Sequence, residues 1–247
     1  MRGFLDGRPS VKVAKRYEVR ACEPGIRMRT EMVNLGADPD LWALSDGLYW
    51  SAREALPFGP YQNGGFNHPK FDLITINDAF RRFPFLAWSS HAPPYASYAT
   101  VACNARAIEG FNSDQVSTAG LPRDIVQRGD HQVFERFLAV TPRSDVAGSA
   151  DLAMDIRQRI FGEAMVTVKG RILRPGNVPI GDAEAKASVI IAETPSETAP
   201  SNQWTPWSQV VPAADGTFSA RVPANRKYIF DVLAFGQSVA RVGRRVG

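Results

Sequence analysis

The sequence predicts an all-β chain with a single helix, and three observations carry this prediction. Asp215-Gly216 is a strong signal for a hairpin turn, and apolar residues then alternate with polar ones from Phe218 to Val222, as in a half-buried strand. The 247 residues include 18 Pro and 20 Gly, which imply many turns. Only one segment, 148–163, has the apolar spacing of a helix.

The first strands are predicted over residues 11–35, with a turn at 23–25. Alternation in the second of these strands places four residues on one face: Ile26, Met28, Thr30 and Met32. A third strand, rich in Leu, Trp and Tyr, is expected over 41–50. Residues 51–80 then form a long loop, dense in Pro, Gly and aromatic rings, which either covers the sheet or binds a ligand. Further strands are predicted at 85–89, 98–103, 107–111 and 131–140.

The predicted helix begins near Ser149, whose side chain can cap it, and Asp151 suits its positive first turn. Gly162 suits its end. The apolar stripe consists of Leu152, Ile156 and Ile160. A domain boundary is expected here, which gives three parts: a β-domain over 1–147, a linking helix over 148–163 and a small β-sandwich over 164–247.

The small sandwich is assembled from short apolar runs separated by loops. Strands are predicted at 165–173, 187–192, 204–211, 218–222 and 228–235. The last residues, 241–247, are interpreted as a polar fragment, and the chain is expected to be a piece of a longer protein.

The charge pattern does not favour a nucleic-acid partner. The net charge is +4, and residues 164–247 hold 10 Lys+Arg against 6 Asp+Glu, so the whole excess lies there. A nucleic-acid surface needs a basic stripe with interleaved aromatic residues, and none is present. No apolar run approaches the roughly 20 residues that span a bilayer, and the N-terminus lacks the apolar stretch of a signal peptide.

Both units have family resemblances. The C-terminal unit resembles the transthyretin-like or carboxypeptidase-regulatory-like β-sandwich, which is also immunoglobulin-like, at Val168-Lys-Gly-Arg-Ile172, Ser188-Val-Ile-Ile191 and Asp215-Gly-Thr-Phe218. The N-terminal unit resembles part of a galactose-mutarotase-type β-supersandwich, at Lys15-Arg-Tyr-Glu-Val-Arg20 and Leu44-Ser-Asp-Gly-Leu-Tyr-Trp50. The expected fold is therefore a supersandwich, a linking helix and a small sandwich.

The order of the two units is similar to the region ahead of the metal-dependent hydrolase domain in bacterial polymerase-and-histidinol-phosphatase-type proteins. That domain would begin with clustered His ligands, and no His follows His131 in this chain. The resemblance therefore implies a non-catalytic accessory region of a longer, extracytoplasmic bacterial protein, with a downstream catalytic domain as its partner.

Six residues are candidates for binding a carbohydrate, because rings pack on sugar C–H surfaces while polar groups take the hydroxyls. They are Trp50, Tyr61, Phe66, His68, His91 and Tyr95. Core packing is the alternative role for the rings. A rival hypothesis is an aldose-epimerase-like enzyme that uses His68, His91 and a carboxylate from Glu109 or Glu135 as acid and base.

The sequence predicts neither a metal nor a cofactor. His68, His91 and His131 with Asp46 or Asp130 match no short ligand motif. Cys22 and Cys103 either pair or, as favoured here, remain buried thiols. The sequence therefore indicates a non-catalytic, carbohydrate-binding accessory region; the alternatives are the epimerase-like enzyme and a structural interaction module.

Overall fold

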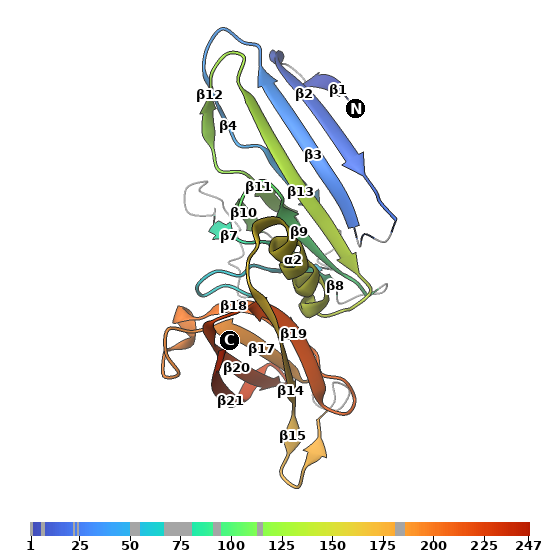
Figure 1. The fold of residues 1–247 in the computed structure, drawn as a ribbon, viewed down its shortest axis with the longest axis vertical. Coiled ribbons are helices and arrows are strands. Elements are labelled where there is room, and N and C mark those ends of the chain that lie inside the picture. Colours follow the sequence, from blue (N-terminus) through green and yellow to red (C-terminus); the bar gives the residue numbers. More distant parts are fainter. Residues whose placement is uncertain are drawn as a thin grey trace.

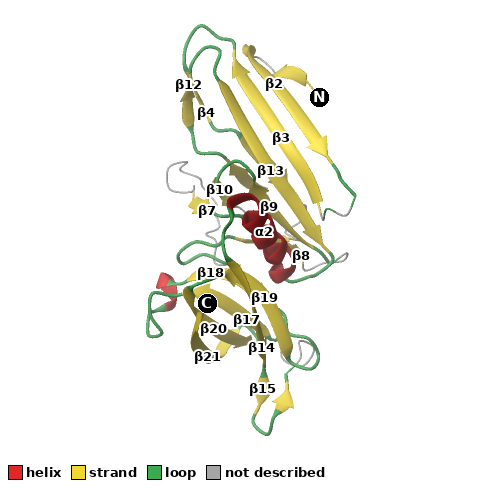
Figure 2. Cartoon of the chain, viewed as in Figure 1, coloured by secondary structure: helices red, strands yellow, loops and turns green. Residues whose placement is uncertain are grey.

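The structure, a computed structural model, describes residues 2–5, 8–21, 23, 25–49, 55–66, 81–90, 95–112, 116–180 and 186–247. These residues form antiparallel sheets around one α-helix, which confirms the all-β class (Figures 1 and 2). The large sheet has the order β1-β2-β3-β13-β9-β8-β6. Its strands are β1 (Arg2–Leu5), β2 (Arg8–Glu18), β3 (Gly25–Asn34), β13 (His131–Thr141), β9 (Ser97–Ala102), β8 (Leu86–Ser90) and β6 (Ala55–Phe58).

A smaller sheet faces the large one. Its strands, in order, are β5 (Ser45–Tyr49), β11 (Val116–Gly120), β10 (Ile108–Asn112) and β7 (Arg81–Phe83). A two-stranded ribbon of β12 (Asp124–Val126) and β4 (Asp40–Trp42) lies beside them. The predicted strand over 41–50 is therefore two strands, since Leu44 turns into the core between them.

Side chains from both sheets meet in one apolar cluster. Leu86 and Trp88 of β8, Phe134 of β13 and Ile108 of β10 are all fully buried there. The neighbouring residue Ala87 points to the opposite face of the large sheet, as strand alternation requires. That face is also covered, so β8 is buried on both sides and shows no alternation of polarity.

The covering element is α2 (Val146–Phe161), which lies between the large sheet and the C-terminal strands (Figure 1). The cap of the helix lies four residues earlier than predicted, because Asp145 rather than Ser149 accepts a hydrogen bond from the Gly148 amide. The Ser149 hydroxyl is buried and donates to the Val146 carbonyl instead. Gly162 ends the helix in the left-handed conformation, as predicted.

The predicted apolar stripe of α2 is only partly right. Ile156 is buried, but Ile160 is 39% exposed. The helix packs on both sides through small residues, with Ala147, Ala150 and Ala153 fully buried. These alanines allow the backbone of α2 to approach two layers at once.

The C-terminal strands form a second, smaller sandwich. A four-stranded sheet has the order β18 (Thr205–Val210), β17 (Ser188–Glu193), β20 (Arg226–Ala234) and β21 (Gln237–Val246). It faces the pair β14 (Met165–Arg171) and β19 (Thr217–Pro223), and the hairpin of β15 (Leu173–Arg174) and β16 (Val178–Pro179) follows β14. A 3-10 turn, η2 (Ser201–Gln203), comes directly before β18. The predicted polar fragment at 241–247 is part of β21, which pairs along its length with β20.

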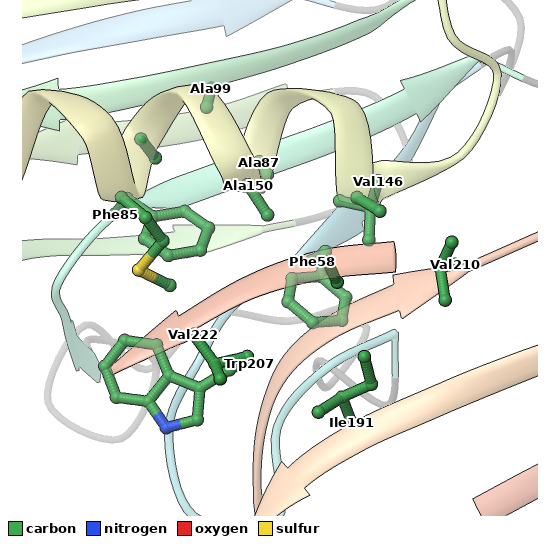
Figure 3. Close-up of a cluster of buried hydrophobic side chains, with 14 of the residues drawn as sticks. Phe58, Phe85, Ala87, Ala99, Val146, Ala150, Ile191, Trp207, Val210 and Val222 are labelled. Carbon is green, nitrogen blue, oxygen red and sulfur yellow. The ribbon is translucent and has the colours of Figure 1, made fainter. Parts of the chain in front are cut away.

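One hydrophobic cluster runs through all three layers (Figure 3). It joins Ala87 and Ala99 of the large sheet to Val146 and Ala150 of α2, and continues to Val222 of β19. Burial of apolar surface stabilises by about 25 cal/mol per Å². A continuous cluster of this kind therefore couples the two sandwiches through the helix. The exact domain boundaries given above stay a prediction.

Candidate functional site

Three of the predicted site residues, Trp50, His68 and His91, lie outside the described residues, as does Cys22. Glu109 of β10 accepts a hydrogen bond from Arg82 at 2.6 Å. The Glu109 carboxylate is therefore paired with the Arg82 guanidinium.

The described aromatic candidates do not converge on one place. The Tyr61 ring lies 5.9 Å from the Phe83 ring and packs against the core between the two N-terminal sheets. The Phe66 ring makes an edge contact with Phe58 at 5.2 Å, next to the cluster that includes α2. Tyr95 is separate and 55% exposed.

The described end of the aromatic loop contacts the C-terminal sandwich. The Asn63 amide donates to the Trp204 carbonyl at 2.8 Å, and the Gln62 side chain donates to the Asn202 carbonyl at 3.4 Å. Gly65, with φ of +78°, lies so close to Pro206 that a Cβ there would be 3.1 Å from its ring. This part of the loop therefore joins the two sandwiches.

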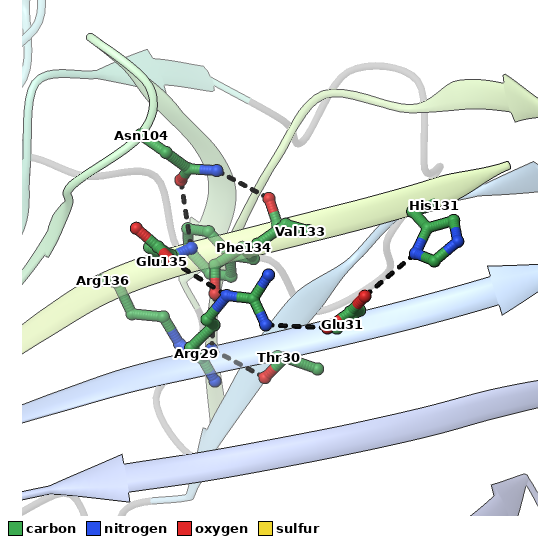
Figure 4. Close-up of polar contacts among 9 residues, drawn as sticks. All are labelled: Arg29, Thr30, Glu31, Asn104, His131, Val133, Phe134, Glu135 and Arg136. Carbon is green, nitrogen blue, oxygen red and sulfur yellow. Dashed lines mark hydrogen bonds and ion pairs between the residues drawn. The ribbon is translucent and has the colours of Figure 1, made fainter.

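A network of polar side chains covers the outer face of β3 and β13 (Figure 4). Arg29 binds Glu31 at 2.7 Å and Glu135 at 3.0 Å, and His131 Nδ1 lies 2.9 Å from Glu31. The hydrogen bonds from His131 and then from Arg29 lower the pKa of Glu31 below its usual value. A small cleft of about 150 Å³ opens beside Arg29 and Glu135, and its lining carries both signs of charge.

The opposite face of the same strands holds a buried ion pair. Arg136 is fully buried, and its Nε and Nη2 each donate to Asp46 of β5 at 2.5 Å. A further nitrogen of Arg136 donates to Thr30 at 2.7 Å, and Lys15 reaches Asp46 at 3.1 Å. This pair ties the large sheet to the small one, so its role is structural.

The cysteine that the structure describes is inert at neutral pH. Cys103 is a free, partly buried thiol, and burial raises its pKa to about 11. Within the described ranges no three or more His, Cys, Asp and Glu side chains group to hold a metal ion. The described helix is too short and too polar to cross a membrane.

A cleft of about 510 Å³ lies where the segment before α2 meets β14 and β19. We call it the junction cleft. Its lining consists of Arg143, Lys169, Gly170, Val210, Val211, Ala213, Thr217, Phe218 and Ser219. The lining therefore combines two cations and two hydroxyls with small apolar side chains.

Asp145 fixes one wall of the junction cleft. Its carboxylate binds Arg143 at 2.6 Å, accepts from the Val211 amide at 2.9 Å and caps α2 at Gly148. Because Asp145 is itself buried, these three contacts hold Arg143 and the end of β18 in place. One residue thus links the N-terminal unit, the helix and the C-terminal sandwich.

The other wall is the paired strands β14 and β19. Lys169 lies directly opposite Ser219 in this ladder, and Gly170 lies opposite Phe218. The Phe218 ring lies across Gly170, so that any side chain there would collide with the ring. The Thr217 hydroxyl donates to Asp215 at 2.6 Å, which leaves its lone pairs as acceptors.

Sequence reasoning missed the junction cleft. In the sequence Arg143 precedes α2 and Lys169 follows it, and the rest of the lining comes from 210–219. None of these segments has a binding motif. The turn at Asp215-Gly216 was recognised, but only as a signal for a hairpin.

No protein-family model and no curated protein matches the chain. GH36 α-galactosidase AgaB from Geobacillus stearothermophilus is similar at 11% identity and a TM-score of 0.41, over 60% of this chain and 24% of that one. A polysaccharide lyase is similar at 7% identity and a TM-score of 0.39, over 96% of this chain and 34% of that one.

A galactose mutarotase-like protein from Lactobacillus casei ATCC 334 is similar at 8% identity and a TM-score of 0.29, over 57% of this chain and 73% of that one. The chain spans about a quarter of the galactosidase and a third of the lyase. Likenesses this distant assign no activity to the chain, so its function is argued from its own residues.

Proposed function

We propose that this chain is a non-catalytic β-sandwich accessory region that binds carbohydrate and supports a neighbouring catalytic domain in a longer bacterial extracytoplasmic protein. In this proposal the N-terminal unit is a mutarotase-type supersandwich, and the C-terminal unit is a sandwich of the carboxypeptidase-regulatory type. The neighbouring domain is a metallohydrolase of the polymerase-and-histidinol-phosphatase type.

The observation that carries the proposal is the junction cleft. Its volume of about 510 Å³ lies within the range of ligand pockets, which is roughly 300–1,000 Å³. The hydroxyls of Thr217 and Ser219 lie beside the apolar side chains of Val211 and Ala213, and a polar group next to an apolar surface suits a sugar. Asp145 and the shared core around α2 hold the two walls in a fixed relation, so the cleft is preformed.

The test is a calorimetric titration of the whole chain with a panel of neutral and acidic oligosaccharides. Ala213→Trp fills the cleft from an exposed position, and Val178→Trp on the exposed β16 hairpin is its matched control. We expect saturable binding by at least one saccharide, lost in the first variant and kept in the second. If Ala213→Trp binds the saccharide normally, the junction cleft is not the binding site.

A structural interaction module is the second candidate, favoured by the shared core that makes the sandwiches one body. A complete lack of response across the saccharide panel would contradict carbohydrate binding and leave this second candidate. The epimerase-like hypothesis stays a prediction, since His68 and His91 lie outside the described residues.

A further inference from the structure

The lining of the junction cleft is positively charged. It contains Arg143 and Lys169 and no carboxylate. Lys169 has no ion-pair partner among the described residues, and it is exposed on β14. Arg143 uses one Nη nitrogen on Asp145, and a guanidinium has five N–H donors, so further donors remain for a ligand.

Two acidic side chains that bind residues of the lining, Asp145 and Asp215, already have partners. Asp145 is buried and receives hydrogen bonds from Arg143 and from two backbone amides. Asp215 accepts from both the amide and the hydroxyl of Thr217, and these bonds lower its pKa below the usual value. Neither carboxylate is free to neutralise Lys169.

We propose that the junction cleft binds an anionic saccharide, with its carboxylate or sulfate group between Lys169 and the free donors of Arg143. The Ser219 hydroxyl, directly opposite Lys169, and the Thr217 lone pairs then take sugar hydroxyls. Val211 and Ala213 form the apolar part of the lining and contact the C–H surface. This inference rests on the proposed function and names its ligand class.

The experiment compares ligands that differ in charge and variants that differ in position. The ligands are tetragalacturonate, its neutral methyl ester, and a sulfated galactan tetrasaccharide without carboxylates. The variants are Lys169→Gln and, as a matched control, Lys227→Gln, which removes one exposed lysine charge from β20 of the same sandwich, outside the cleft. Isothermal calorimetry gives the affinities, and circular dichroism checks that both variants fold.

We expect at least one anionic ligand to bind tighter than the methyl ester, and its affinity to fall with added salt. Loss of a charge-assisted contact should weaken that ligand about tenfold in Lys169→Gln and less than about twofold in Lys227→Gln. Whichever of the carboxylate and sulfate ligands binds with the higher affinity identifies the anionic group that the cleft prefers. Binding of the methyl ester should be the same in all three proteins.

Equal binding of the neutral and anionic ligands would overturn the inference, and so would equal effects of the two lysine variants. If neutral saccharides bind and Ala213→Trp abolishes that binding, the proposed function stands and only the anionic preference fails. If no saccharide of either kind binds, both fail together.

Discussion

At the scale of single residues, the ion pair of Arg136 and Asp46 contributes to stability because it is buried. Both groups are withdrawn from water, and Arg136 is fully buried. Removing one partner of a buried pair leaves an uncompensated charge, which typically costs about 3–5 kcal/mol. Asp46→Ala should therefore lower the free energy of unfolding by about that amount in urea denaturation.

The double variant Asp46→Ala with Arg136→Met is the control for this prediction. It removes the stranded charge as well, so it should recover a large part of the loss. A single variant within about 1 kcal/mol of the parent would contradict the assignment of this pair as the tie between the two N-terminal sheets.

A second residue-scale prediction concerns pH. Asp151 of α2 accepts from the Arg221 amide at 2.6 Å, and burial raises its pKa from 3.8 to about 6. Since the folded-state pKa lies above the unfolded one, this residue's contribution to stability is full below pH 4 and is lost as the pH rises through 6. The loss amounts to about 3 kcal/mol at most. Asp151→Asn should therefore remove this slope from unfolding measurements between pH 4 and 6.

Asp155→Asn is the matched control, since Asp155 lies on the same helix with a more exposed carboxylate that binds Arg221. This variant should keep the slope between pH 4 and 6. An unchanged slope in Asp151→Asn would show that another group titrates there.

At the scale of elements, α2 depends on the residue before its first turn. Asp145→Ala removes the cap of Gly148 and leaves the Val211 amide without its acceptor. Loss of a cap costs about 1 kcal/mol and an unsatisfied buried amide about 1–3 kcal/mol, so we expect a loss of about 2–4 kcal/mol in thermal or urea unfolding. Ser149→Ala should cost less than about 1 kcal/mol, because Ser149 does not cap the helix. Equal effects would contradict this.

The sequence predicted most elements because their signals are local. Alternation at Met28 and Thr30 places both in the core, and Gly162 ends the helix with a positive φ. The start of α2 was misplaced because Ser149 and Asp145 are both good capping residues, and tertiary contacts decide between them. β21 was missed because its residues are polar or exposed, and its strand geometry comes from pairing with β20.

At the scale of the whole molecule, the shared core predicts that the two sandwiches lose stability together. Met154 of α2 is fully buried in that core. Met154→Ala should cost about 2–5 kcal/mol. Hydrogen exchange should show the same loss of protection in β13 of the large sheet and in β17 of the small sandwich.

Ile160→Ala, at the exposed end of the same helix, should change protection in neither strand by more than about 1 kcal/mol. Loss of protection confined to one sandwich in Met154→Ala would show that the two units unfold independently.

Most of the candidate site also depends on the fold of the whole molecule. Arg143, Lys169 and Ser219 come together only when α2 folds against β19, which no local pattern reports.

The open side of β21 bears on how copies of this chain meet. Among the described strands β21 lies at the end of its sheet, and its ten residues include Arg241, Arg244 and Arg245. A strand with unpaired backbone groups is a template for another chain. Two molecules that aligned these strands would bring guanidinium groups close together, and repulsion between charges closer than about 8 Å persists at physiological ionic strength. The arginines of β21 therefore oppose pairing of this strand with a second copy, and this opposition weakens in concentrated salt.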